Sequence, residues 1–221
     1  MIIKVCGMRE PENIRQVAGL DIDWMGFIFY ERSPRKITDG AERHDAVIRT
    51  SASRPRLKRV GVFVNASPEE MMETAAVYQL DYLQLHGNET PDDCHALQKR
   101  GYSLIKAFSV ATADDLKRTS GYEGRADYFL FDTKCKGYGG SGKQFDWSVL
   151  EAYEGETPFL LSGGIRPESA EAIRRFCHPR FAGIDLNSGF EIEPGLKDTH
   201  QLENFIRDLA RPESRSSITN H

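Results

Sequence analysis

The feature that most constrains the fold is a succession of eight short apolar runs spread along the chain. In order, they cover residues 2–6, 24–29, 60–64, 82–85, 104–107, 128–131, 159–161 and 183–186. Each run is too short for a buried helix and is mostly continuous rather than alternating. This pattern is typical of parallel strands that are covered on both faces. We therefore predict eight buried parallel strands.

The segments between the runs carry signals for helix starts. The Ser-Pro-Glu-Glu stretch at 67–70 supplies an N-cap, a first-turn proline and a capping-box glutamate, and similar starts occur at Pro11, Thr90-Pro91 and Pro167. A final amphipathic helix is indicated by Leu202, Phe205, Ile206 and Leu209. Alternating strands and helices imply a parallel sheet, which is either a closed barrel or an open doubly wound sheet. Eight units favour the barrel.

No linker divides the chain into two domains. We expect one (β/α)8 barrel over residues 1–210, followed by a disordered tail over residues 211–221, because this tail has a single apolar residue, Ile218.

Composition and charge exclude several classes of protein. With 39% hydrophobic and 28% charged residues, the chain is typical of a soluble globular protein. A net charge of -4 gives no reason to expect nucleic-acid binding. Neither a membrane span nor a signal peptide is indicated, so we expect a cytoplasmic protein. The four cysteines form neither a CxxC pair nor a zinc spacing, which fits a reducing compartment and predicts no metal site.

In a barrel of this kind, active-site residues lie at the carboxyl ends of the strands. The residues that follow the eight runs are Cys6 and Gly7, Tyr30 with 33–35, Asn65, His86 and Gly87, 108–109, 132–133, 162–164 and 187–189. Cys6 is either a packed apolar residue or a base, if a nearby cation lowers the pKa of its thiol. Gly7 beside it would allow a substrate to approach closely.

Asp132 ends the sixth run, whose apolar residues would remove water from the carboxylate and favour its protonated form. We expect it to be a general acid; the alternative is a cap for the following loop. Since Cys6 and Asp132 come from strands one and six, they can face each other across the barrel mouth.

Two glycine-containing turns follow strands seven and eight, at 162–164 and 187–189. This pair of loops is the usual phosphate site of a barrel, although each turn could also be an ordinary tight turn. The Gly-Gly-Ser-Gly-Lys stretch at 139–143 lacks the Walker spacing, so we expect a mobile loop that covers substrate rather than an ATP site. Arg35 either holds a substrate carboxylate or is an ordinary surface residue, and His86 either orients substrate or stabilises the end of strand four.

Together these residues closely resemble the phosphoribosylanthranilate isomerase family of tryptophan biosynthesis. The matching blocks are 4–7, 26–30 with 33–35, 60–65, 83–87, 131–133, 139–143 with 145–147, 161–164, Asp185 with 188, 189 and 191, and 194–195 with 197–198. Any one block could be accidental, but the ordered set is highly specific. The resemblance implies a single-domain (β/α)8 TIM barrel.

The resemblance also implies roles for individual residues. Cys6 corresponds to the base and Asp132 to the acid. Substrate-binding positions correspond to Arg35, which would bind the carboxylate, and to His86 and Asp185. The phosphate-binding positions correspond to Ser141, Gly142, Gly163, Gly164, Ser188 and Gly189. Asn187 departs from the small hydroxyl residue expected at its position.

The implied reaction is an Amadori rearrangement of a small phosphorylated substrate, with no cofactor and no metal. A related histidine-pathway isomerase performs the same rearrangement, but it has an aspartate where Cys6 stands. A barrel that only binds a sugar phosphate would need neither Cys6 nor Asp132. The protein is expected to be a monomer or a homodimer.

Overall fold

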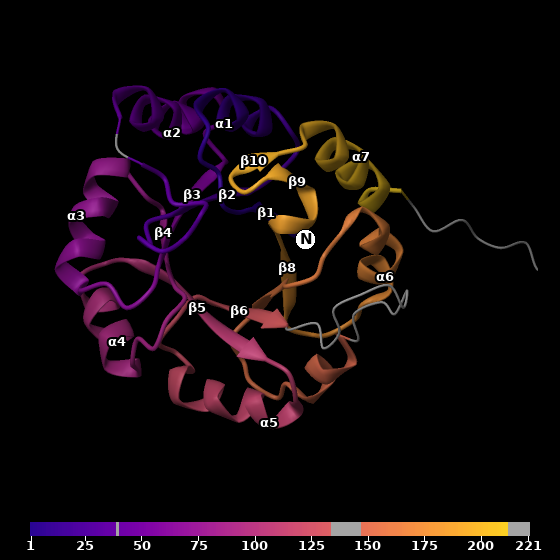
Figure 1. The fold of residues 1–221 in the computed structure, drawn as a ribbon. Coiled ribbons are helices and arrows are strands. Elements are labelled where there is room, and N and C mark those ends of the chain that lie inside the picture. The colour runs from indigo at the N-terminus through magenta and orange to yellow at the C-terminus, as the bar shows by residue number, and fades with distance from the viewer. Residues whose placement is uncertain (39, 134–146, 212–221) are drawn as a thin grey trace, which may run out of the picture.

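The computed structural model describes residues 1–38, 40–133 and 147–211, and of residues 51–53 and 133 only the backbone. Eight parallel strands, hydrogen-bonded in sequential order, close into one barrel (Figure 1). They are β1 (Ile2–Val5), β2 (Trp24–Ile28), β3 (Lys58–Phe63), β4 (Tyr82–Leu85), β5 (Ser103–Val110), β6 (Tyr128–Thr133), β7 (Phe159–Ser162) and β8 (Phe181–Leu186). Each of the eight apolar runs contributes one strand, so the predicted barrel is confirmed.

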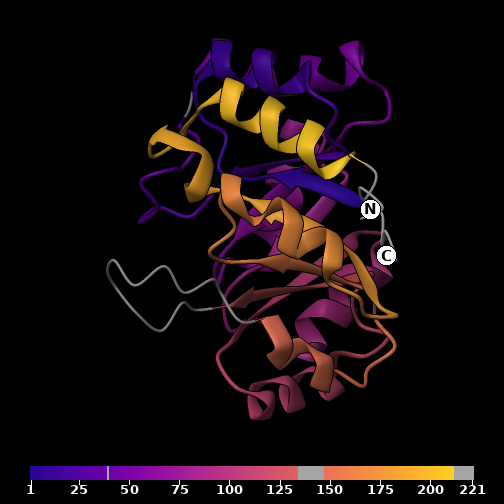
Figure 2. The ribbon, with the colours of Figure 1, turned by 90° about the vertical axis from the view of Figure 1, so that its right-hand side faces the viewer.

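Helices form a ring around the strands (Figure 1). The α-helices are α1 (Pro11–Ala18), α2 (Ala41–Ser53), α3 (Pro68–Tyr78), α4 (Pro91–Lys99), α5 (Ala113–Leu116), α6 (Ala170–Arg175) and α7 (Thr199–Leu209). Short 3-10 helices are η1 (Lys117–Tyr122), η2 (Trp147–Ala152), η3 (Pro167–Ser169) and η4 (Ser188–Phe190). The C-terminal helix α7 lies beside α1 and closes the ring (Figure 2).

The helix-start signals are confirmed at most positions. The Ser67 hydroxyl accepts a hydrogen bond from the backbone N–H of Glu70, and Thr90 forms a capping box with Asp93. Pro167 begins a 3-10 helix rather than an α-helix, and the described helix of the sixth unit is the six-residue 3-10 helix η2. Short 3-10 segments are frequent at the amino-terminal ends of α-helices and as connectors, and the sequence signals did not distinguish the two helix types.

Two apolar layers make up the core. The larger layer fills the space between the strands and the helices. Inside the barrel, Trp24 lies at the start of β2, where its ring stacks on Tyr82 at 4.7 Å and meets Tyr128 edge-on at 5.1 Å. These three residues begin alternate strands, as is usual for a layer of a barrel interior. They fill the amino-terminal end of the barrel, so the interior can be open to ligand only at the other end.

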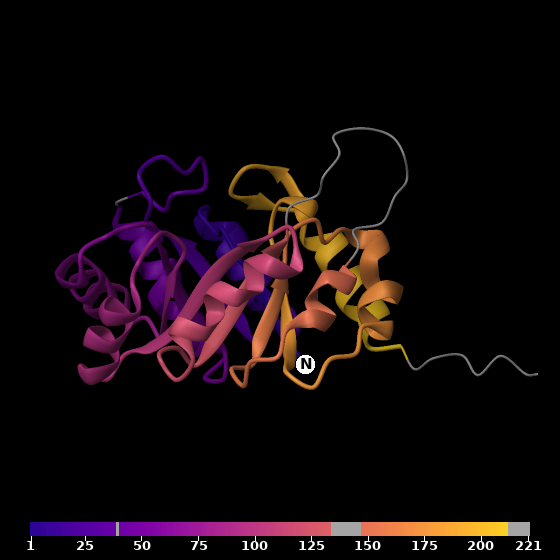
Figure 3. The same ribbon diagram turned by 90° about the horizontal axis from the view of Figure 1, so that it is seen from below.

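An antiparallel hairpin, β9 (Glu191–Glu193) and β10 (Leu196–Lys197), stands above the carboxyl ends of the strands (Figure 3). The sequence did not predict this hairpin. It connects β8 and η4 to α7, and it brings two charged residues to the rim of the barrel.

The remaining expectations have mixed outcomes. The sequence predicts Cys94 and Cys177 to be ordinary apolar residues; Cys94 is buried, whereas Cys177 is exposed, so the prediction was wrong for Cys177. Cys135 and the tail from residue 212 onward lie outside the described residues, so the domain boundary at 210 and the disorder of 211–221 stay predictions. Within the described ranges, no helix is long and apolar enough to span a membrane, and no cluster of side chains suits a metal ion.

Candidate active site

A pocket of about 310 Å³ opens at the carboxyl ends of the strands. Most of the site residues expected from the sequence line it, namely Cys6, His86, Asp132, Gly163, Gly164, Asp185, Ser188 and Gly189. Arg35 does not line this pocket. Ser141 and Gly142 fall outside the described residues, as does the loop expected to cover substrate.

Cys6 follows β1 and is held against β8 by a hydrogen bond from its backbone N–H to the carbonyl of Leu186. A Cβ atom at Gly26 would lie 2.7 Å from the Cys6 sulfur, so a glycine there makes room for the thiol. Lys4 lies two residues earlier, with its ammonium 2.9 Å from a carboxylate oxygen of Asp185. Successive side chains of a strand alternate between faces, so Lys4 and Cys6 share the interior face.

Burial raises the pKa of the Cys6 thiol, while the nearby cations Lys4 and Lys197 act in the opposite direction. The expectation that a cation lowers this pKa was therefore wrong in its net direction, although the cation is present. The physical reason is that Cys6 is 3% exposed, and removing a thiolate from water opposes its ionisation.

Asp132 lies near the end of β6, and its side chain is 36% exposed. The apolar run before it led us to expect a carboxylate shielded from water, which was wrong. Phe129 and Phe131 pack in the outer layer, whereas Leu130 packs inside the barrel. Asp132 shares the face of Leu130 by strand alternation and therefore faces the open pocket.

The loops after β7 and β8 lie in direct contact. Gly163 and Gly164 have φ angles of 85° and 67°, which a side chain rarely adopts. A Cβ atom at Gly189 would lie 2.1 Å from the carbonyl oxygen of Ile165, so only glycine allows this approach. Among the described residues, the backbone N–H groups of 163, 164, 188 and 189 have no hydrogen-bond acceptor. Unpaired backbone donors that line one pocket are suited to an anion.

Arg35 forms an ion pair with Glu191, whose side chain is 5% exposed. A Cβ atom at Gly7 would lie 2.9 Å from Cδ of Arg35, so the arginine stem packs over the backbone next to Cys6. Arg35 is thus adjacent to the pocket without lining it. Asn187, the departure from the expected pattern, accepts a hydrogen bond of 2.8 Å from the ammonium of Lys197.

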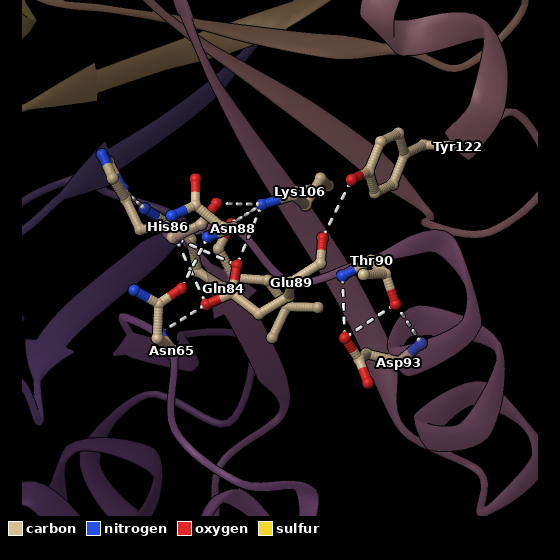
Figure 4. Close-up of polar contacts among 11 residues, drawn as sticks. Asn65, Gln84, His86, Asn88, Glu89, Thr90, Asp93, Lys106 and Tyr122 are labelled. Carbon is tan, nitrogen blue, oxygen red and sulfur yellow. Dashed lines mark hydrogen bonds and ion pairs between the residues drawn. The ribbon is translucent and has the colours of Figure 1, made fainter.

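His86 is held at the end of β4 by a polar cluster (Figure 4). Its Nε2 lies 3.8 Å from a carboxylate oxygen of Asp132, and its Nδ1 lies 2.9 Å from the side-chain nitrogen of Gln84. Behind it, the buried ammonium of Lys106 lies 2.9 Å from the carboxylate of Glu89. Glu89 also accepts hydrogen bonds from the backbone N–H groups of 65 and 87 (Figure 4). The cluster fixes the loops after β3 and β4.

Several of these residues were missed by the sequence analysis. Lys4, Gln84 and Lys106 are polar residues inside otherwise apolar strands, and this is a signal that could have marked them. Glu191 and Lys197 lie in blocks that match the family, but their pairing depends on a hairpin that the sequence did not predict.

Taken together, the pocket holds the Cys6 thiol, the Asp132 and Asp185 carboxylates and a set of unpaired backbone donors. A base and an acid that share one pocket can move protons on a single small substrate, and the donors can hold its anionic group.

Known proteins that are similar to this chain all point to one family. The family model of N-(5'-phosphoribosyl)anthranilate (PRA) isomerase matches residues 3–208. An N-(5'-phosphoribosyl)anthranilate isomerase of Parabacteroides distasonis is 68% identical, over 96% of this chain and 95% of the relative. The isomerase of Phocaeicola vulgatus is 51% identical, over 95% of this chain and 98% of the relative.

Solved structures give the same result. The phosphoribosyl anthranilate isomerase of Thermotoga maritima matches with a TM-score of 0.79 and 34% identity, over 95% of this chain and 98% of that chain. A second structure of such an isomerase, in complex with reduced 1-(o-carboxyphenylamino)-1-deoxyribulose 5-phosphate, matches with a TM-score of 0.77 and 31% identity, over the same shares of the two chains. The chain therefore belongs to the N-(5'-phosphoribosyl)anthranilate isomerase family.

Proposed function

We propose that Cys6 is the general base and Asp132 the general acid of the reaction that this isomerase catalyses. That reaction is the Amadori rearrangement of N-(5'-phosphoribosyl)anthranilate to 1-(2-carboxyphenylamino)-1-deoxyribulose 5-phosphate in tryptophan biosynthesis. The observation that carries the assignment is that both side chains line one pocket together with the two glycine loops.

The proposed sequence of proton transfers begins at the sugar ring. Asp132 gives its proton to the ring oxygen, the bond from this oxygen to C1 breaks, and the nitrogen lone pair forms a protonated Schiff base. Cys6, as a thiolate, then removes the proton from C2, and the electron pair of that bond neutralises the nitrogen to give an enolamine. Tautomerisation of the enolamine yields the ketone. Each assisted proton transfer is typically worth roughly 10²–10⁴ in rate.

The environment of Cys6 suits this role. Its raised pKa makes the thiolate a stronger base, which removal of a proton from carbon requires. Lys4 and Lys197 favour the negative charge that the thiolate carries before it accepts that proton.

We assign the substrate phosphate to the backbone donors of Gly163, Gly164, Ser188 and Gly189. This is supported by their shared place in the pocket and by the phosphate on the ligand of the related solved complex. Ser141 and Gly142 stay proposed phosphate ligands on the family resemblance alone.

In this proposal the carboxylate end of the substrate lies near the loop after β2, and its ribose lies between β4 and β8. Arg35 binds the carboxylate of the anthranilate ring, and His86 and Asp185 orient the sugar. The ligand of the related complex carries a carboxyphenyl group, which supports a carboxylate subsite.

The wider assignments are proposals as well. We expect a cytoplasmic enzyme that binds neither nucleic acid nor membrane, and that is a monomer or a homodimer. A related Thermotoga maritima enzyme is described as dimeric.

The test is an Asp132→Asn variant. Because an amide keeps the shape but cannot deliver a proton, kcat is expected to fall by at least about 10²-fold. The free energy of unfolding should stay within about 1–2 kcal/mol of the wild type. Anthranilate, phosphoribosyl pyrophosphate and the preceding transferase generate the labile substrate in place, and its fluorescence reports turnover.

Asp127→Asn is the matched control. Asp127 precedes β6 at the opposite end of the barrel, where its carboxylate accepts a hydrogen bond from the backbone N–H of Leu104. Its substitution should affect stability and leave kcat nearly unchanged. If Asp132→Asn is destabilised but keeps most of its turnover, Asp132 is a structural residue and another acid must act.

A further inference from the structure

Glu191 is a buried carboxylate that no step of the proposed mechanism uses. It lies at the start of the β9–β10 hairpin, and its side chain is 5% exposed. Its Oε1 accepts hydrogen bonds from the ammonium of Lys197 at 2.6 Å and from the backbone N–H of Gly195 at 3.1 Å. The guanidinium of Arg35 forms an ion pair with the same carboxylate. Such a fully paired buried carboxylate holds its partners in one geometry.

The geometry of the Arg35 contact is specific. Nε donates to both carboxylate oxygens of Glu191, at 2.9 and 3.0 Å, and Nη2 donates to Oε2 at 2.6 Å. Glu191 therefore occupies the Nε–Nη2 edge of the guanidinium. Among the described residues, Nη1 of Arg35 has no acceptor. A guanidinium carries five N–H donors in a planar fork, so its Nη1–Nη2 edge stays free for a second carboxylate.

The charges of the cluster also favour a second anion. While Cys6 is a neutral thiol, Arg35 and Lys197 carry two positive charges and Glu191 one negative charge, which leaves a net charge of +1. Burial acts to raise the pKa of Glu191, but hydrogen bonds from Arg35 and Lys197 outweigh it and hold that pKa below its usual value. Glu191 is therefore ionised at neutral pH, and Lys197 compensates its charge. The charge of Arg35 is left available to a ligand.

We propose that Glu191 is a positioning residue that holds Arg35 by one edge and presents the other edge to the ring carboxylate of the substrate. This inference rests on the proposed role of Arg35 in binding that carboxylate. An arginine side chain loses conformational entropy when it binds a carboxylate. Glu191 restricts the Arg35 side chain before substrate binds, so less entropy is lost in the binding step. Glu191 thereby contributes to selectivity for an anthranilate group over an aniline group.

Simple charge attraction makes the opposite prediction. If only Coulomb attraction mattered, Glu191→Gln would raise the local charge from +1 to +2 and tighten the binding of any carboxylate. If positioning matters, the same substitution weakens that binding, because Arg35 is no longer held. The two accounts differ in the sign of the effect.

The experiment uses two stable ligands and calorimetry. One ligand is the reduced product, 1-(o-carboxyphenylamino)-1-deoxyribulose 5-phosphate, and the other is its counterpart without the ring carboxylate. The ratio of their Kd values measures the contribution of the carboxylate alone. The ratio is determined for the wild type, Arg35→Met and Glu191→Gln. Glu171→Gln is the control, because Glu171 pairs with Arg175 on the exposed surface of α6.

In the wild type, the carboxylate should tighten binding by about 10- to 100-fold, as expected for a charge-assisted bidentate contact. Arg35→Met should bring the ratio close to one. Glu191→Gln should reduce the wild-type ratio by at least about threefold, and Glu171→Gln should leave it unchanged. If the single variant does not fold, a Glu191→Gln/Lys197→Met variant replaces it, since this variant removes the buried carboxylate together with the fully buried ammonium that pairs with it.

Two results overturn the inference, and they are distinguishable. If Arg35→Met removes the selectivity but Glu191→Gln keeps or increases it, Glu191 does not position Arg35, and the proposed carboxylate subsite stands. If Arg35→Met keeps the wild-type ratio, the carboxylate is bound elsewhere, and the proposed role of Arg35 fails together with the inference.

Discussion

Replacing Lys106 by methionine is expected to destabilise the barrel far more than replacing a surface lysine. The side chains of Lys106 and Glu89 are each 3% exposed, and their charged atoms lie 2.9 Å apart. The Lys106 ammonium also donates to the carbonyls of residues 85 and 87, at 3.2 and 2.8 Å (Figure 4). Lys106→Met removes all three contacts and leaves the Glu89 carboxylate buried without its cation.

Breaking a buried ion pair by removing one partner typically costs about 3–5 kcal/mol. Glu89 keeps hydrogen bonds from the backbone N–H groups of 65 and 87, so we expect the lower end, about 3 kcal/mol. For a chain of this length, each kcal/mol lowers Tm by about 2–4 °C, which gives a decrease of roughly 6–12 °C. A Lys106→Met/Glu89→Gln variant should recover at least about 1 kcal/mol, because no unpaired charge remains.

Urea denaturation followed by circular dichroism measures these differences. Lys58→Met is the matched control, because Lys58 also lies on a strand and pairs with Asp81 at 3.1 Å, but its side chain is 44% exposed. Its loss should cost less than about 1 kcal/mol. The reasoning would be refuted by a Lys106→Met variant within 1 kcal/mol of the wild type, or by a double variant that loses the sum of the two single losses.

Two further predictions concern the active site. Gly189→Ala should raise KM by about 10- to 100-fold, because the added Cβ lies 2.1 Å from the carbonyl oxygen of Ile165 and must separate the two phosphate loops. Gly121→Ala meets only ordinary contact at 3.7 Å and is its control, and equal KM values for the two variants would contradict the phosphate assignment. Since burial raises the pKa of Cys6 above the ordinary thiol value of 9.0, and the thiolate is the reactive form, the rate of Cys6 alkylation by iodoacetamide, followed by mass spectrometry, should still be rising between pH 7 and 9. A plateau reached below pH 7 in a pH profile would show that the base has a lowered pKa.

The fold and the positions of the site residues could be predicted from the sequence for a simple reason. Eight apolar runs with helix signals between them allow few topologies, and in a barrel every strand delivers its carboxyl end to the same rim. Cys6, His86 and Asp132 are far apart in sequence but line one pocket because each lies at or just beyond the end of its strand.

The electrostatics of the site were harder to predict. The run before Asp132 is apolar on both faces, so its residue types did not show which face is covered. Asp132 in fact faces an open pocket. For Cys6, the sequence suggested that a nearby cation would lower the pKa of the thiol. It could not show that burial raises this pKa by more than the cations lower it. The pairing of Arg35 with Glu191 joins residues 156 positions apart through a hairpin that had no sequence signal.

The central claim, that Cys6 is the base at C2, is tested most directly by a Cys6→Ser variant. Serine fits the space beside Gly26 but ionises only far above neutral pH. The variant should therefore bind ligand as the wild type does while its turnover falls. We expect Tm and the Kd of the reduced product to stay near the wild-type values, while kcat falls by about 10²–10⁴-fold. A Cys6→Ser variant that keeps near wild-type kcat would contradict the account.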